Sequence, residues 1–209
     1  MDKKKVNYSL YLVTDRELLD GRDLYQSIEQ AIRGGVTLIQ LREKSVSTKE
    51  FLEIALKVKE TTSRYGIPLI INDRVDIALA VDADGLHVGQ DDMPMAKARE
   101  LLGPDKIIGV SVSTVAEAIL AEQQSADYLG VGAIFPTSTK TDAKKASLEE
   151  LQLIKNSVTI PVVAIGGINK TNAQQVMATG IDGLSVVSAI LAQDNIQEAA
   201  RILRGLIAQ

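Results

Sequence analysis

Short apolar runs rich in β-branched residues alternate with segments of helical period along the whole chain, and this alternation is what most constrains the fold. Strands that alternate with helices predict a parallel sheet covered by helices. We identify eight apolar runs, at residues 9–15, 37–43, 68–73, 85–89, 106–112, 128–134, 161–167 and 183–189. Eight units of roughly 26 residues each predict one α/β domain over residues 1–209, a closed (β/α)8 TIM barrel.

A doubly wound open sheet is the second candidate for this pattern. Dinucleotide-binding proteins of that fold carry a glycine-rich G-x-G-x-x-G turn after the first strand. Here the residues VTDREL stand at that point, so the barrel is the better prediction.

The composition argues against several classes of function. With a formal net charge of -4 and 3% aromatic residues, the chain lacks the basic surface and the stacking side chains of a nucleic-acid binder. It has no cysteine for disulfides, thiolate chemistry or Cys-based zinc sites, and no apolar run long enough to cross a bilayer. We expect a cytoplasmic protein with small-molecule ligands and no nucleic-acid or membrane partner; a homo-oligomer is left open.

The carboxyl ends of barrel strands meet on one face, where the active sites of such proteins lie. The polar residues at the ends of the second to fifth runs are Arg42, Glu43 and Lys44, Asn72 and Asp73, Gln90, Asp91 and Asp92, and Ser111 and Ser113. The segment FPTSTKTDAKKAS follows the sixth run, GGI the seventh and VSA the eighth. These segments are therefore the candidate site.

Asp73 and Asp92 follow neighbouring strands, so their carboxylates can approach closely enough to share one hard cation. Mg²⁺ typically takes one or two carboxylates and accepts substrate phosphate oxygens as further ligands. Two alternatives stay open: an acid/base pair, or helix N-caps for the segments that start at Arg74 and Met93. A cap is the better interpretation for Asp91, with Pro94 just inside the helix.

A glycine pair, Gly166 and Gly167, ends the seventh run, and we expect a helix to start at NKTN directly after it. Backbone N–H groups at such a turn, together with Val187 and Ser188 after the eighth run, form the phosphate site expected at this corner of a barrel. The alternative is that the glycines only permit a tight turn.

Several cations lie near the same face of this acidic chain. Arg42 and Lys44 share a short segment with Gln40, and Lys140 lies in the segment after the sixth run. They indicate a second polyanionic group beside the carboxylates. For Lys144 and Lys145, exposure to water is the simpler interpretation.

The single histidine, His87, lies inside an apolar run, where a packed and hydrogen-bonded residue is more common than a metal ligand. No cysteine, G-x-S-x-G turn or Ser-His pair supplies a nucleophile. The pattern indicates a site that binds two phosphorylated groups and stabilises a departing anion.

Seven motifs follow one another along the chain: QLREK, IINDRVDIAL, ADGLHVGQDD, GVS, FPTSTK, VAIGGI and VSAI. With these motifs in this order, the chain resembles the thiamine phosphate synthase (thiamine-phosphate pyrophosphorylase) family over nearly its whole length. The resemblance implies a (β/α)8 transferase that joins hydroxymethylpyrimidine diphosphate to hydroxyethylthiazole phosphate, or to its carboxylated form. It also implies one Mg²⁺ per subunit and a dissociative reaction in which pyrophosphate leaves first.

The resemblance also implies roles for individual residues. Mg²⁺ would be held by Asp73 and Asp92, and catalysis would depend on Arg42, Ser111 and Lys140. The pyrimidine diphosphate would be bound by Gln40, Leu41, Arg42, Glu43, Lys44, Asn72, Ser111 and Lys140. The thiazole phosphate would be bound by Thr137, Ser138, Thr139, Gly167, Val187 and Ser188.

One departure from the family discriminates between related activities. Many synthases carry a histidine where this chain has Ser113, and the related thiazole tautomerases use that histidine as their acid/base group. With Ser113 in place and Asp73, Asp92 and Lys140 present, a synthase is the better prediction. The alternatives are the tautomerase and a non-catalytic regulator that binds thiazole phosphate.

Overall fold

The computed structural model describes residues 3–137 and 145–207. The strands of this part of the chain close into a barrel in the order β1 to β8, and β1 pairs with β8 in parallel. They are β1 (Leu10–Val13), β2 (Leu38–Leu41), β3 (Leu69–Asn72), β4 (Gly85–Val88), β5 (Ile107–Val112), β6 (Tyr128–Val131), β7 (Val162–Ile165) and β8 (Gly183–Val186). The predicted α/β barrel is confirmed, and the open sheet is wrong because β1 and β8 close the ring.

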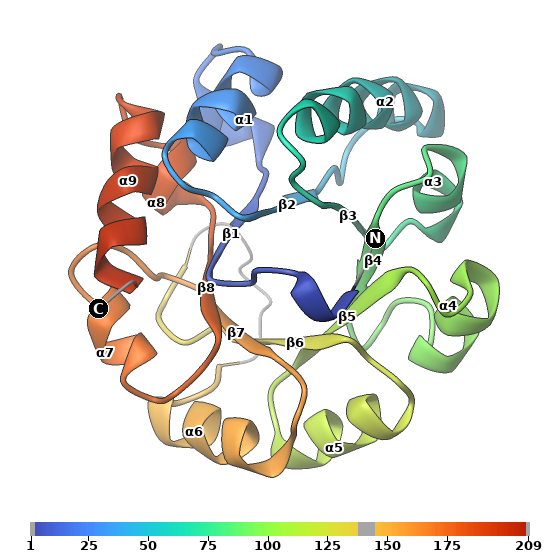
Figure 1. The fold of residues 1–209 in the computed structure, drawn as a ribbon, viewed down its shortest axis with the longest axis vertical. Helices are drawn as coiled ribbons and strands as arrows, with labels where there is room; N and C mark the ends of the chain where they lie inside the picture. Colours follow the sequence, from blue (N-terminus) through green and yellow to red (C-terminus); the bar gives the residue numbers. More distant parts are fainter. Residues whose placement is uncertain (1–2, 138–144, 208–209) are drawn as a thin grey trace.

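The helices surround the strands, as Figure 1 shows. They are α1 (Leu24–Arg33), α2 (Thr48–Arg64), α3 (Val75–Ala80), α4 (Met95–Leu102), α5 (Val115–Gln123), α6 (Leu148–Ser157), α7 (Ala173–Met177), α8 (Ser188–Leu191) and α9 (Ile196–Ile207). Two short 3₁₀ turns, η1 (Lys3–Lys5) and η2 (Arg16–Leu19), lie before and after β1. None of the helices in the described ranges combines the length and apolar character that crossing a bilayer requires.

Alternate residues of each strand face opposite sides of the barrel wall, which gives two apolar regions. In β2, Leu38 belongs to a small cluster inside the barrel, whereas Ile39 and Leu41 belong to the larger core between strands and helices. Three buried tyrosines, Tyr8, Tyr11 of β1 and Tyr128 of β6, are the largest members of the inner cluster. The interior is therefore filled by side chains except at its carboxyl end.

A repeated aspartate arrangement closes the amino end of the barrel. The residue before each of β4, β6 and β8 is an aspartate. Its Oδ2 accepts a hydrogen bond from a backbone N–H of the preceding strand and forms an ion pair with a cation of a helix. The aspartates are Asp84, Asp127 and Asp182; the N–H groups belong to Leu69, Ile108 and Val162; the cations are Lys59, Arg99 and Lys155. Each aspartate thus joins two strands and one helix.

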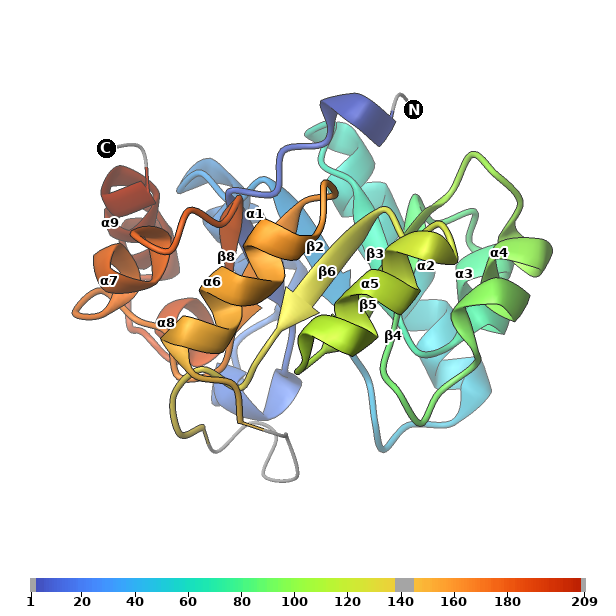
Figure 2. The same cartoon turned by 90° about the horizontal axis from the view of Figure 1, so that it is seen from below.

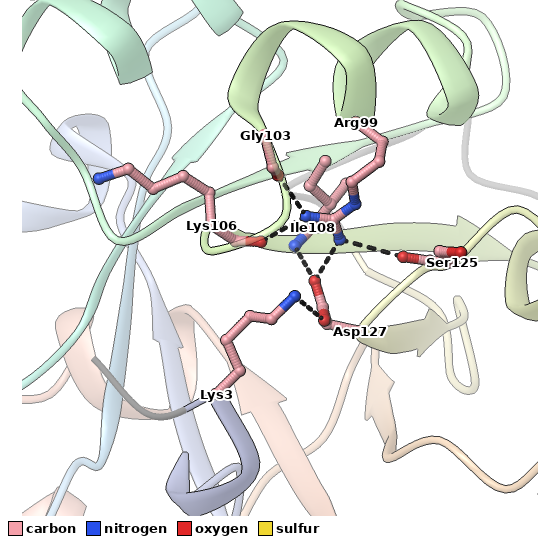
Figure 3. Close-up of polar contacts among 7 residues, drawn as sticks. All are labelled: Lys3, Arg99, Gly103, Lys106, Ile108, Ser125 and Asp127. Carbon is pink, nitrogen blue, oxygen red and sulfur yellow. Dashed lines mark hydrogen bonds and ion pairs between the residues drawn. The ribbon is translucent and has the colours of Figure 1, made fainter.

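Asp127 shows this arrangement most fully (Figure 3). Its Oδ2 accepts from the Ile108 N–H at 2.8 Å and pairs with Arg99, and its Oδ1 lies 2.8 Å from the Lys3 ammonium. Arg99 also donates to the backbone carbonyl oxygens of Gly103, Lys106 and Ser125. In Figure 2 the N-terminal turn lies at this end of the molecule, and the arrow of β6 points away from it toward the opposite end.

Candidate active site

A cavity of about 260 Å³ opens at the carboxyl end of the barrel. Its lining includes most of the residues predicted from the sequence, contributed by seven of the strand ends or the loops that follow them. These are Gln40, Arg42, Lys44, Asn72, Asp73, Asp92, Ser111, Thr137, Gly167, Val187 and Ser188. The fold therefore brings these residues, which were predicted for the two substrates and the metal, together in one cavity.

Two predicted residues on the second strand segment do not reach this cavity. Leu41 is fully buried in the core between strands and helices. The Glu43 carboxylate lies 2.9 Å from Arg16, and burial raises the pKa of Glu43. Strand alternation explains the difference, because Gln40, Arg42 and Lys44 turn one way and the residues between them turn the other.

Three predicted residues of the strand-6 segment, Ser138, Thr139 and Lys140, lie outside the described residues, as does Lys144. Their assignments remain predictions. Lys145 is described and is exposed, as expected for a water-facing lysine.

Two carboxylates face each other beside one cation on the β3 and β4 side of the cavity. Asp73 follows β3 with a positive φ of 60° and forms an ion pair with Lys44. Asp92 accepts a hydrogen bond from the Gly89 N–H at 2.8 Å, and burial together with the Asp73 carboxyl raises the pKa of Asp92. Burial and a neighbouring carboxylate both disfavour the ionised form of Asp92.

The capping alternative for these aspartates is wrong. The N-cap of α3 is Arg74 and that of α4 is Pro94, and neither helix has a side-chain cap hydrogen bond. Asp91 does not cap α4 either, and lines the cavity instead. Asp92 does not cap α4 because its Oδ2 accepts a hydrogen bond from the Gly89 N–H in the preceding loop and not from an N–H of the helix.

The donor set at Asp73 and Asp92 fits a hard divalent cation. Two carboxylates in contact, one of them paired with Lys44, offer oxygen ligands and an excess of negative charge, which Mg²⁺ prefers. Among residues 3–137 and 145–207, no cluster of three or more His, Cys, Asp or Glu side chains could hold a metal. A cation here would thus depend on water or substrate oxygens for its remaining ligands.

The glycine corner after β7 is held by close backbone contact. Gly166 and Gly167 have positive φ values of 103° and 60°, and a Cβ on Gly167 would lie 2.6 Å from the carbonyl oxygen of Pro136. The expected helix starts later than NKTN, at Ala173, because the Asn172 side chain accepts from the Asn169 N–H at 2.8 Å and forms a turn there. Gly167 nonetheless lines the cavity, so both the tight turn and the ligand-facing position are present.

His87 is packed and hydrogen-bonded, as the sequence predicts, but it also faces the cavity. Its Nδ1 lies 2.8 Å from the Tyr128 hydroxyl and its Nε2 lies 2.9 Å from the Ser111 hydroxyl. Tyr11 and Glu117 line the cavity as well and were not predicted as site residues. Strand alternation could have predicted both positions. Tyr11 and His87 lie two residues before Val13 and Gly89, so each pair points to the same, inner face of its strand.

Ser113, the residue that departs from the family pattern, has both its polar groups engaged. Its backbone N–H and its hydroxyl donate to the Glu117 Oε2 at 2.7 and 3.0 Å. The position therefore offers a hydroxyl held by a carboxylate and no imidazole for proton transfer.

The chain is similar to known proteins over most of its length. A family model described as thiamine monophosphate synthase matches residues 10–190. The thiamine-phosphate synthase of Clostridium acetobutylicum is 63% identical over 204 residues, which cover 98% of this chain and 97% of that protein. The one from Clostridium tetani is 56% identical, with 98% of each chain covered.

A solved structure agrees in both fold and sequence. The thiamine phosphate pyrophosphorylase from Pyrococcus furiosus matches with a TM-score of 0.90 at 44% identity, covering 97% of this chain and 96% of that one. The chain therefore belongs to the thiamine monophosphate synthase family of transferases.

Proposed function

We propose that this enzyme joins hydroxymethylpyrimidine diphosphate to hydroxyethylthiazole phosphate, or to its carboxylated form, and releases pyrophosphate. The observation that carries the proposal is a single cavity with two different anion sites. Carboxylates and cations follow β2, β3 and β4, while a glycine corner follows β7 and a short helix follows β8. Such a cavity suits one diphosphate and one monophosphate held side by side.

The pyrimidine diphosphate is assigned to the β2 to β5 side. Arg42 and Lys44 supply positive charge there, and Gln40, Asn72 and Ser111 supply neutral hydrogen-bonding groups. Gln40 and Asn72 are buried, so they suit the base, whereas the more exposed Lys44 suits the diphosphate. Lys140 is assigned to the leaving diphosphate by family resemblance.

The thiazole phosphate is assigned to the opposite side of the cavity. Gly167, Val187 and Ser188 line it there, and Thr137 approaches from the strand-6 segment. Ser138 and Thr139 are assigned to the same site by resemblance. Backbone N–H groups at glycine turns and at the start of a short helix after the eighth strand are the usual phosphate ligands in barrels.

Asp73 and Asp92 would hold one Mg²⁺ per subunit. Bound there, Mg²⁺ would supply positive charge that offsets the charge of the diphosphate. Lys44 forms an ion pair with Asp73 and so compensates the charge of one of the two carboxylates.

The reaction needs no protein nucleophile. The bond between the pyrimidine methylene carbon and the diphosphate oxygen breaks, the electron pair leaves with pyrophosphate, and the thiazole nitrogen then bonds to the same carbon. With the carboxylated thiazole as acceptor, the carboxyl group must also leave as carbon dioxide to give thiamine phosphate. Arg42 and Lys140 stabilise the developing charge on the departing oxygens, and this electrostatic stabilisation lowers the barrier. Ser113 offers no imidazole, so the tautomerase alternative has no acid/base group at the expected position.

Ligand binding tests this division of the cavity. Calorimetric titration should show pyrimidine diphosphate binding that strengthens at least tenfold with Mg²⁺, and thiazole phosphate binding that Mg²⁺ changes little. A chain that binds thiazole phosphate but no pyrimidine diphosphate would be the regulator, and the proposed function would be wrong.

A further inference from the structure

A chain of hydrogen bonds crosses the barrel interior from β2 to β5. Gln40 Nε2 donates to the Tyr11 hydroxyl at 2.7 Å, and that hydroxyl lies 2.7 Å from the hydroxyl of Tyr128. The Tyr128 hydroxyl lies 2.8 Å from His87 Nδ1, and His87 Nε2 lies 2.9 Å from Ser111 Oγ. We call these five residues the relay. Its two ends, Gln40 and Ser111, are residues of the proposed pyrimidine site.

The two tyrosines of the relay are buried. Tyr11 and Tyr128 are 1% and 0% exposed. Glycines on the inner face of the barrel leave room for the rings: a Cβ on Gly109 would lie 2.0 Å from the Tyr128 ring, and one on Gly130 would lie 3.1 Å from the His87 imidazole. The relay is therefore a fitted part of the interior, and buried hydroxyls of this kind are costly unless each is satisfied.

With Gln40 Nε2 as the donor to Tyr11, one set of directions leaves every proton of the relay hydrogen-bonded. An amide nitrogen can only donate, so Tyr11 accepts from Gln40 and uses its one proton toward Tyr128. Tyr128 in turn donates to His87 Nδ1, which leaves the imidazole proton on Nε2 to be donated to Ser111. Burial raises the pKa of both tyrosines, so both hydroxyls keep their protons at neutral pH.

The two ends of the relay consequently have linked polarity. With its nitrogen donating to Tyr11, Gln40 has its carbonyl oxygen on the other branch of the amide, where it can accept from a ligand. Ser111 accepts from His87, so its own proton is available to donate. Reversing either end would require every bond between them to reverse, including the tautomer of His87.

We propose that Tyr11, Tyr128 and His87 are positioning residues that hold Gln40 as a hydrogen-bond acceptor and Ser111 as a donor toward the pyrimidine ring. This rests on the proposed function, since it concerns the site assigned to the pyrimidine diphosphate. An aminopyrimidine presents a donor at its exocyclic amine and acceptors at its ring nitrogens, which is the complementary set. The relay thereby selects this base by polarity as well as by shape.

The tautomer of His87 is the direct spectroscopic test. The chain contains one histidine, so ¹⁵N spectra of histidine-labelled enzyme report on His87 alone. We expect a protonated Nε2 and an unprotonated Nδ1 in the wild type. A protonated Nδ1 would overturn the proposal, whatever the activity of the enzyme, because the relay would then run in the opposite direction.

Kinetics test the positioning role. Tyr128→Phe and Tyr11→Phe each remove one hydroxyl and keep the ring, and we expect KM for the pyrimidine diphosphate to rise about tenfold while KM for the thiazole phosphate stays within about twofold. Tyr128→Phe should also populate both His87 tautomers. The matched control is Tyr8→Phe, since Tyr8 is a buried member of the same cluster that packs on Tyr128 but lies outside the relay.

The outcomes separate the relay from the function it serves. Unchanged KM values and an unchanged tautomer in Tyr128→Phe and Tyr11→Phe would overturn the relay while leaving the synthase assignment intact. An equal rise in KM in Tyr8→Phe would show a general packing effect and would also overturn it. A wild-type enzyme that forms no thiamine phosphate would contradict the proposed function, and the ¹⁵N spectrum would still decide the direction of the relay.

Discussion

Lys44, an exposed lysine after β2, forms an ion pair with Asp73, one of the two carboxylates that follow β3 and β4. The other carboxylate, Asp92, has its pKa raised by burial and by Asp73, with Lys44 opposing the shift. One lysine therefore partly compensates two charges. This imbalance is the physical basis of the proposed cation site, and it carries a cost in stability.

We predict that Asp92→Asn stabilises the metal-free protein slightly. A folded-state pKa above the ordinary 3.8 means that the folded protein binds this proton more tightly than the unfolded chain does. Ionisation as the pH rises past that value therefore costs stability, and the cost is fully present at neutral pH. Asn removes the charge and retains an oxygen to accept from Gly89. Because solvent screens this partly exposed group, Tm should rise by only about 1–2 °C at pH 7.

The same variant should lose its response to the cation. Millimolar Mg²⁺ should raise the Tm of the wild type in the presence of pyrophosphate, and should leave Asp92→Asn nearly unchanged. Turnover should fall at least a hundredfold. Wild-type turnover in Asp92→Asn, or an equal Mg²⁺ response in both proteins, would show that Asp92 is not a ligand.

We predict that Lys44→Met weakens the pyrimidine diphosphate site. Removing the charge should raise KM for this substrate about tenfold or more, because a cation that meets a diphosphate makes a charge-assisted hydrogen bond. KM for the thiazole phosphate should change less than twofold. Lys49→Met is the matched control, since Lys49 is exposed near the start of α2 and does not line the cavity; a similar loss in both would contradict the assignment.

We predict that Gly167→Ala disrupts the thiazole phosphate site. The new Cβ would lie 2.6 Å from the Pro136 carbonyl oxygen at a positive φ of 60°, so the loop after β6 must move. KM for the thiazole phosphate should rise more than tenfold. Gly180 also has a positive φ, of 83°, but has open space around it. Gly180→Ala should therefore lower the free energy of unfolding by about 1 kcal/mol through backbone strain and leave both KM values unchanged.

We predict that Asp127→Ala destabilises the fold without affecting substrate binding. It leaves the Ile108 N–H and the Arg99 guanidinium without their shared carboxylate at the amino end of the barrel (Figure 3). The free energy of unfolding in urea should fall by about 3 kcal/mol. The exposed Asp105, in the loop before β5, is the control, and Asp105→Ala should change stability by no more than about 0.5 kcal/mol. A change in KM for Asp127→Ala would contradict a purely structural role.

The sequence predicts much of this molecule because its signals are local. The eight apolar runs correspond to the eight described strands, and strand ends such as Asp73 and Asp92 could be placed on one face from barrel geometry alone. Side-chain direction at the ends was harder, since Leu41 and Glu43 stand in the same segment as Gln40 and Arg42 but face the outer core and Arg16.

Contacts between distant strands could not be predicted in this way. The relay joins β1, β2, β4, β5 and β6 through pairs separated by up to 117 residues, as in Tyr11 and Tyr128. The period of two says that Tyr11 and His87 point inward, but which hydroxyl meets which nitrogen depends on barrel register. The prediction of Asp92 as a helix cap is wrong for a similar reason, because its carboxylate accepts from the nearby Gly89 N–H.

The most direct test of the account is the stoichiometry of the reaction catalysed by the purified enzyme. Hydroxymethylpyrimidine diphosphate and hydroxyethylthiazole phosphate, or its carboxylated form, are incubated with Mg²⁺, and thiamine phosphate and pyrophosphate are measured together. The account predicts one pyrophosphate for each thiamine phosphate, with formation of both abolished when a chelator removes Mg²⁺ and restored when Mg²⁺ is returned. Failure to form thiamine phosphate with either thiazole would contradict it.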